Sequence, residues 1–129
     1  MAVRQNAGMA EPVTVWFNPR CSKCRGAEAL LCERNVEAEY VPYLETSPSR
    51  RDLEHVLTLL GTDDPRAIIR TGEDVYKELG LAGADRDALL DAMAEHPILI
   101  ERPIVIVGDR AVVARPPEKL LELLDAAGR

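Results

Sequence analysis

The sequence predicts an α/β fold in which a β-α-β segment and a β-β-α segment are separated by a helical block. Short apolar runs typical of buried strands alternate with longer segments whose apolar residues recur at i, i+3, i+4 and i+7, the spacing of an amphipathic helix. The chain has 129 residues, of which 47% are hydrophobic, and this suits one compact domain. We expect residues 1–12 to form a flexible leader and residues 13–129 to form a single domain.

The β-α-β segment is predicted from residues 13–43. Val13–Phe17 is an apolar run typical of a central strand, and the stripe of apolar residues that follows indicates a helix from about Ser22 to Arg34. Ala38–Tyr43 predicts a second strand, and Pro42 limits its pairing because proline has no backbone N–H.

The helical insertion is predicted at about residues 47–96. Apolar residues at helical spacing indicate a helix that opens near Ser47 and runs through Leu60, with Gly61 ending it. Short helical pieces are expected around residues 65–69 and 73–79. A further helix is expected over Asp85–Glu95, with its apolar face turned inward.

The β-β-α segment closes the domain and completes a thioredoxin-like topology. Ile104–Val107 and Ala111–Ala114 predict two strands joined by a hairpin-length turn, and Pro116–Ala126 predicts the last helix. In thioredoxin-like folds a proline before the third strand packs near the nucleophilic cysteine, and Pro103 has that position. We therefore predict a cis peptide bond between Arg102 and Pro103, although only about 5–6% of X–Pro bonds are cis.

Cys21 is the strongest candidate for a reactive residue because it lies at the turn from the first strand to the first helix. The unpaired N–H groups and the positive end of the helix dipole at such a turn lower the pKa of a thiol and favour the nucleophilic thiolate. Arg20, Lys23 and Arg25 add positive charge nearby. We expect Cys21 to titrate below the value of about 8.5 for a free thiol.

Composition narrows the function classes further. The net charge of −6 argues against a nucleic-acid or acidic-membrane surface, so an anion site would need locally clustered arginines. No run reaches the roughly 20 apolar residues that span a bilayer.

Three cysteines make a poor disulfide framework, which favours the reducing cytoplasm. His55 and His96 do not complete a zinc site, so no metal is expected. Five arginines are interpreted as solvated surface charges: Arg20, Arg25, Arg50, Arg51 and Arg66.

Five motifs in order along residues 13–124 resemble the glutaredoxin-linked arsenate reductase family. They are Asn18-Pro19-Arg20-Cys21, Tyr43-Leu44-Glu45-Thr46, Ala67-Ile68-Ile69-Arg70 followed by Glu78-Leu79-Gly80-Leu81, the stretch from His96 to Val105, and Arg115-Pro116-Pro117-Glu118. The resemblance covers nearly the whole chain, and the stretch from His96 to Val105 is the most specific part of it.

The resemblance implies that the protein is an arsenate reductase, an oxidoreductase that takes part in arsenic detoxification. Cys21 would attack arsenate to form a covalent adduct, a small thiol such as glutathione would reduce it to arsenite, and glutaredoxin or a similar redoxin would regenerate the enzyme. It also implies a cytoplasmic monomer without a bound cofactor. Guanidinium groups suit a tetrahedral oxyanion because each donates two hydrogen bonds. The oxyanion-binding residues would be Arg70, Arg102 and Arg115, and the active-site loop would include Asn18, Ser22 and Pro103.

Two residues depart from the family pattern and keep other functions open. Cys24 forms a Cys-x-x-Cys pair with Cys21 where these reductases commonly carry a residue such as serine, and residues at i and i+3 are neighbours on a helix. Cys24 is therefore a candidate resolving thiol. Phe17 occupies a position where some members carry histidine. The alternatives are a general dithiol oxidoreductase that uses Cys21 and Cys24, and a redox-sensing transcriptional regulator of the Spx type.

Overall fold

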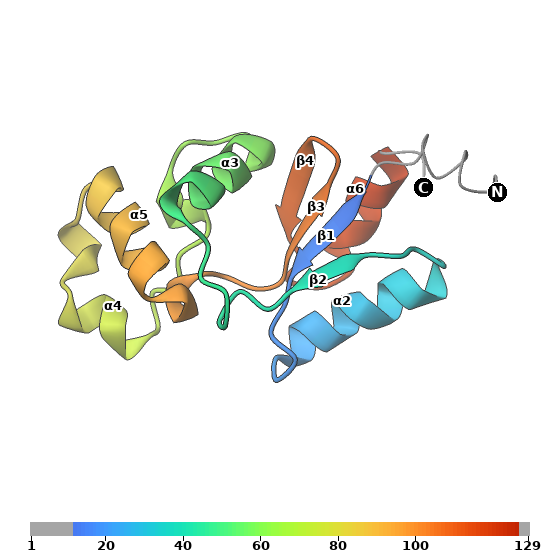
Figure 1. The fold of residues 1–129 in the computed structure, drawn as a ribbon, viewed down its shortest axis with the longest axis horizontal. Coiled ribbons are helices and arrows are strands. Elements are labelled where there is room, and N and C mark those ends of the chain that lie inside the picture. Colours follow the sequence, from blue (N-terminus) through green and yellow to red (C-terminus); the bar gives the residue numbers. More distant parts are fainter. Residues whose placement is uncertain (1–11, 127–129) are drawn as a thin grey trace. The chain divides into compact units, whose positions relative to one another are not determined.

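The structure, a computed structural model, describes residues 12–126. These residues fall into two compact units, one made of residues 12–41 and 102–126 and the other of Pro42–Glu101 (Figure 1). The predicted leader lies outside the described residues except for Pro12, and the predicted single domain stays a prediction. The helical insertion predicted at about 47–96 falls inside the second unit. Within residues 12–126, no helix is long and apolar enough to cross a membrane.

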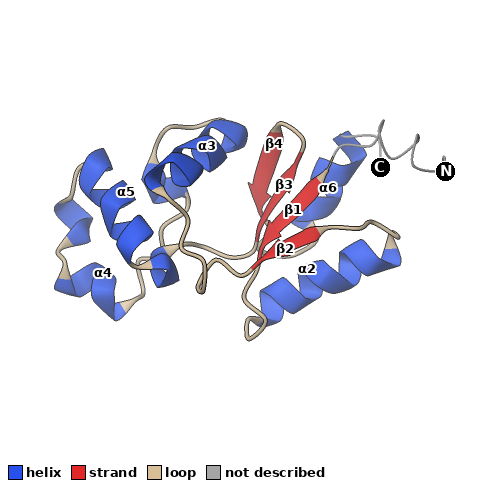
Figure 2. Ribbon diagram, viewed as in Figure 1, coloured by secondary structure: helices blue, strands red, loops and turns tan. Residues whose placement is uncertain are grey.

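The first unit contains a four-stranded sheet with the order β2-β1-β3-β4 (Figure 2). Its strands are β1 (Val13–Trp16), β2 (Glu39–Val41), β3 (Ile104–Val107) and β4 (Arg110–Val113). β1 pairs in parallel with β2 and antiparallel with β3, and β3 pairs antiparallel with β4. The predicted central position of β1 and the thioredoxin-like order are therefore confirmed. β2 is shorter than predicted, since Pro42 directly after it has no N–H to donate to a ladder.

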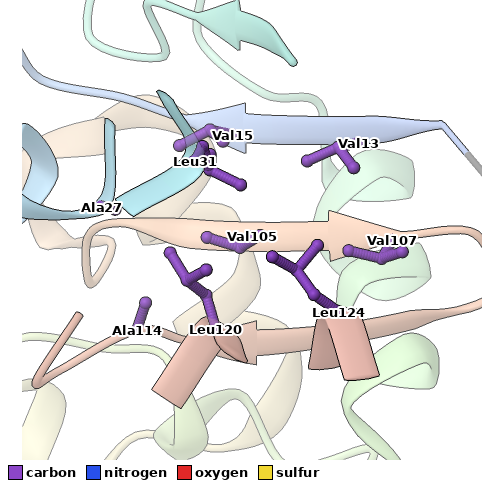
Figure 3. Close-up of a cluster of buried hydrophobic side chains, with 9 residues drawn as sticks. All are labelled: Val13, Val15, Ala27, Leu31, Val105, Val107, Ala114, Leu120 and Leu124. Atoms are coloured by element: carbon purple, nitrogen blue, oxygen red, sulfur yellow. The ribbon is translucent and has the colours of Figure 1, made fainter. Parts of the chain in front are cut away.

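Helices α2 (Ser22–Glu33) and α6 (Lys119–Ala126) complete the first unit. Both contribute to one hydrophobic cluster with the sheet, and they do so through residue pairs four positions apart on each helix (Figure 3). Alternate residues of β1 and β3 supply the other side of this cluster. The cluster consists of Val13, Val15, Ala27, Leu31, Val105, Val107, Ala114, Leu120 and Leu124. This packing fixes α2, and with it the turn that carries Cys21, against the central strands.

The second unit is helical. It contains α3 (Arg50–Leu60), α4 (Asp74–Glu78), α5 (Arg86–Glu95) and the short 3₁₀ helices η1 (Pro65–Ala67), η2 (Leu81–Gly83) and η3 (Pro97–Leu99). Gly61 ends α3 in the left-handed conformation with φ 84°, as the sequence predicts. An isolated bridge between Ile69 and Ile100 connects the segment after η1 with the end of the unit.

Two helices begin later than predicted. α3 starts at Arg50 and not near Ser47 because Ser49 forms a capping box: its hydroxyl accepts a hydrogen bond from Asp52 N, and the Asp52 carboxylate accepts one from Ser49 N. α6 starts at Lys119 and not at Pro116. The N–H groups of residues 119–121 donate to carbonyls three residues earlier, so this first turn is tighter than an α-helix.

Candidate active site

Asn18 organises the turn between β1 and α2. Its carbonyl oxygen accepts a hydrogen bond from Cys21 N at 2.9 Å, and its side-chain Oδ1 accepts one from Arg20 N at 3.0 Å. Its own backbone N–H donates to Cys24 Sγ at 3.4 Å. One asparagine therefore connects the loop backbone to both cysteines, which agrees with its predicted place in the active-site loop. Ser22 follows as the first, exposed residue of α2.

Cys21 is the N-cap residue of α2, in an extended conformation, and its side chain caps no backbone N–H. The residue is 7% exposed. Burial by itself raises the pKa of this thiol. Hydrogen bonds from the backbone N–H and the thiol of Cys24 and from Lys23 N–H, together with the charge of Arg102, outweigh burial and hold the pKa of Cys21 below its usual value. These contacts act in the direction that the sequence predicts, and they favour the thiolate at the first turn of the helix.

Cys24 lies one helical turn further on and is fully buried. Burial is the main reason that its pKa is raised to about 12, and the neighbouring Cys21 adds to the effect. Cys24 therefore stays a neutral thiol at physiological pH, and it donates a hydrogen bond to Cys21. Both cysteines are free, as is the exposed Cys32.

Arg102 and Pro103 lie on the loop that leads into β3. The peptide bond between them is cis, as predicted, and Pro103 is buried. The Arg102 Nε atom is buried and has no hydrogen-bond partner among residues 12–126. A buried charged donor without a partner is costly, so this guanidinium is suited to an acceptor that arrives with a ligand. The charge of Arg102 also acts on the Cys21 thiol, which puts the two in one electrostatic site.

Arg115 is joined to the same loop from the end of β4. Its Nη1 donates a hydrogen bond to the carbonyl oxygen of Arg102 at 3.0 Å. The backbone supports this contact, since Ala114 N donates to Pro103 O at 2.9 Å. A second cis bond, between Arg115 and Pro116, follows directly, and the sequence does not predict it. The structure thus joins Arg115 to Arg102, and the charge of Arg102 acts on Cys21, so these three predicted site residues are connected within the first unit.

Comparison with known proteins identifies the family of this chain. The sequence matches the ArsC family over residues 16–123. The chain belongs to the ArsC family. An arsenate reductase from Neisseria meningitidis serogroup A is 46% identical over 114 residues, which cover 87% of this chain and 97% of that protein. The protein YfgD of Escherichia coli K12 is 44% identical over 118 residues, which cover 90% of this chain and 99% of YfgD.

A solved structure agrees with the sequence comparison. An arsenate reductase from Vibrio cholerae superposes with a TM-score of 0.85 at 46% identity, over 89% of this chain and 99% of that one. The predicted resemblance and the thioredoxin-like α/β fold are both confirmed. Cys21, Arg102 and Arg115 therefore lie together in a fold that members of the ArsC family share.

Arg70, the third predicted oxyanion-binding arginine of this ArsC-family chain, belongs to the second unit. Its backbone N–H donates to Leu99 O at 2.7 Å, beside the bridge between Ile69 and Ile100. Its Nη2 lies 3.3 Å from Glu73 Oε2, and its buried Nη1 has no partner among the described residues. A guanidinium with one nitrogen paired and one free can still take an acceptor, and its part in the Cys21 site stays a prediction.

Arg66 is exposed, as predicted, but it also makes hydrogen bonds that the sequence does not predict. Its Nη1 donates to Tyr76 Oη at 3.1 Å, and its Nη2 contacts the carbonyl oxygens of Leu81, Ala82 and Ala84 at 3.1 Å each. These bonds connect η1 with α4 and η2, on either side of the segment that carries Arg70. No periodicity could reveal this, since three of the four partners are backbone carbonyl groups in and after η2.

Phe17, the second residue that departs from the family pattern, lies directly before the active-site turn. Phe17 packs edge-on against Tyr40 with ring centroids 5.2 Å apart, so in this ArsC-family chain it is part of the packing beside the core. Within residues 12–126, no group of three or more His, Cys, Asp or Glu side chains could hold a metal ion.

Proposed function

We propose that this protein is an arsenate reductase that uses Cys21 as the nucleophile. The observation that carries the proposal is the Cys21 thiol, with its lowered pKa, beside the charge of Arg102, whose buried Nε has no partner among the described residues. The names of the Neisseria meningitidis and Vibrio cholerae relatives support the same substrate.

The site needs positive charge because both reactants are anionic. Arsenate is a mixture of monoanion and dianion at neutral pH, and both forms repel an attacking thiolate. Arg102 and Arg115 offset this repulsion with guanidinium groups, and Arg115 is held in place by its bond to Arg102 O. We propose that Arg70 supplies the third guanidinium.

Reduction then takes two covalent steps. The Cys21 thiolate attacks arsenic, so an S–As bond forms while one As–O bond breaks and its oxygen leaves as water after accepting protons. The thiolate of a small thiol such as glutathione next attacks Cys21 Sγ. An S–S bond forms, the S–As electron pair stays on arsenic, and arsenic passes from the pentavalent to the trivalent state. The two thiols have lost the two electrons that arsenic gained, and a glutaredoxin-type dithiol reduces the mixed disulfide.

An external thiol suits the second step better than Cys24. Cys24 would have to become a thiolate, and burial opposes this by raising its pKa to about 12. Formation of the arsenic adduct removes the negative charge of Cys21 but leaves that burial unchanged. We therefore assign Cys24 the role of a hydrogen-bond donor that stabilises the Cys21 thiolate.

A general dithiol oxidoreductase is the second candidate function. The observation that favours it is the pair of free thiols one helical turn apart, with Cys24 in hydrogen-bonding contact with Cys21. In this candidate, a disulfide between the two cysteines would form in each turnover, so Cys24 would be essential.

The test is arsenate-dependent NADPH oxidation in a coupled system of glutathione, glutaredoxin and glutathione reductase. We expect turnover in the wild type, none in Cys21→Ser, and retained turnover in Cys24→Ser, whose hydroxyl can still donate a hydrogen bond. Cys32→Ser is the matched control, because it removes an exposed thiol elsewhere on α2.

Two results would decide against the proposal. If the wild type shows no arsenate-dependent turnover with any of several small thiols and redoxins, the protein is not an arsenate reductase. If turnover is normal in Cys32→Ser but absent in Cys24→Ser, the external-thiol mechanism is wrong and the dithiol route replaces it.

A further inference from the structure

Gly26 lies inside α2, in its second turn. Glycine is among the least favourable residues in a helix interior, so its presence at this point calls for a physical reason. A Cβ atom built on Gly26 would lie only 2.9 Å from Pro117 Cγ and 3.5 Å from Pro117 Cβ. Carbon atoms do not approach to 2.9 Å without something moving, so the missing side chain makes room for the proline ring.

Pro117 cannot easily move away from α2. Its carbonyl oxygen accepts a hydrogen bond from Leu120 N at 3.0 Å in the first turn of α6. Leu120 and Leu124 of that helix are fully buried in the core cluster of the first unit. A push on Pro117 in the direction of α6 would therefore disturb a packed core.

The other side of Pro117 leads directly to the active site. Arg115 is only two residues away, and its Nη1 donates to Arg102 O. The two residues that follow Arg115 are prolines with a fixed φ, and Pro117 also restricts the backbone of Pro116. Such a stiff, short connection transmits a displacement of Pro117 to Arg115.

We propose that Gly26 is a positioning residue for Arg115: by leaving room for Pro117, it sets where the Arg115 guanidinium lies for oxyanion binding. The inference rests on the proposed function, since it assigns Arg115 to the arsenate site. A glycine without such a role would behave differently. Its replacement by alanine would favour the helix and leave the kinetics unchanged.

The experiment is a double-mutant cycle of Gly26→Ala and Pro117→Ala, because alanine at 117 removes the Cγ atom at 2.9 Å but keeps the Cβ atom at 3.5 Å. Two quantities are measured: the KM and kcat for arsenate, and the arsenate concentration that half-protects Cys21 from iodoacetamide. Gly83→Ala is the matched control, because a Cβ there meets nothing within 4 Å.

In Gly26→Ala we expect KM and the half-protecting concentration to rise about tenfold, the loss expected for one misplaced charge-assisted hydrogen bond, with kcat changed much less. In the double variant both should return to the values of Pro117→Ala. Unchanged KM in Gly26→Ala, or a rise that Pro117→Ala does not relieve, would overturn the inference. If Gly26→Ala does not fold, the double variant decides: KM equal to that of Pro117→Ala supports the inference and a tenfold higher KM refutes it.

This design separates the inference from the proposed function. Turnover of arsenate by the wild type tests the function alone. Protection of Cys21 requires only that arsenate binds, so the comparison between variants can be made even if the reducing thiol has not been found.

Discussion

Replacement of Arg66 by alanine should destabilise the second unit by about 2–3 kcal/mol. Of its four contacts, those with Tyr76 Oη and Leu81 O are partly buried, and those with Ala82 O and Ala84 O are exposed. Water can replace Arg66 at the exposed carbonyls, so mainly the two partly buried bonds count. Each contributes about 1–1.5 kcal/mol.

Urea unfolding followed by far-UV circular dichroism measures this loss, because the second unit is mainly helical. The fluorescence of Trp16, the single tryptophan, reports the first unit at the same time. Coincident transitions would justify one free energy of unfolding for both units. Two separate transitions would assign the loss to one of them.

Two further variants make the reasoning refutable. Arg66→Lys keeps the charge, but a single ammonium group cannot reach both Tyr76 Oη and the carbonyl oxygens, so it should retain at most half of the stabilisation. Arg51→Ala, an exposed substitution on α3, should change stability by no more than about 0.5 kcal/mol. Arg66→Lys as stable as the wild type, or a loss below about 0.5 kcal/mol in Arg66→Ala, would show that these hydrogen bonds do not stabilise the fold.

Three other predictions concern the active site. Cys24→Ala should raise the pKa of Cys21, because the thiolate loses a hydrogen-bond donor, and Cys24→Ser should raise it less. The pH profile of Cys21 modification by iodoacetamide measures this pKa, and equal midpoints in the wild type and in Cys24→Ala would contradict the prediction. The stabilisation from the neutral, buried Cys24 is fully present below the pKa of this thiol in the unfolded chain and is lost as the pH rises toward about 12. Cys24→Ala should therefore flatten the alkaline limb of stability in urea unfolding, and identical limbs would be evidence against it. Arg115→Lys should raise the KM for arsenate about tenfold, because a single ammonium group cannot donate to Arg102 O and also form two parallel hydrogen bonds to an oxyanion. An unchanged KM would exclude Arg115 from the site.

Local patterns predict the regular elements of this fold well. Val13–Trp16 is recognisable as a central strand because the run is almost entirely apolar, and the structure buries most of it. Gly61 ends a helix because glycine adopts the positive φ of this position without a steric cost. The start of α6 is predicted less well. Helical periodicity begins near Pro116, but hydrogen bonds between residues three apart hold residues 116–118 in a tighter turn.

The candidate site is only partly predictable for a different reason. Cys21 can be predicted from its local position at a strand-to-helix turn. Arg102 and Arg115 are predicted only from the family resemblance. Their contact joins residues 13 apart, and the contact of Gly26 with Pro117 spans most of the chain. A glycine inside a predicted helix is visible in the sequence, yet nothing in the sequence says what approaches it.

The electrostatics of the first unit suit the binding of an anion beside Cys21. Acidic residues exceed basic ones by 22 to 16. Within the part of the chain that the structure describes, Arg34, Arg50, Arg70 and Arg86 form ion pairs with carboxylates. Arg102 and Arg115 have no carboxylate within salt-bridge distance in that same part, although they lie beside each other and Arg102 acts on Cys21. Arg115 is joined to Arg102, whose buried Nε has no partner among the described residues and whose charge acts on a thiol that favours its anionic form, so the pair suits an anionic ligand. A tetrahedral oxyanion can accept hydrogen bonds from both guanidinium groups and react with the nucleophile.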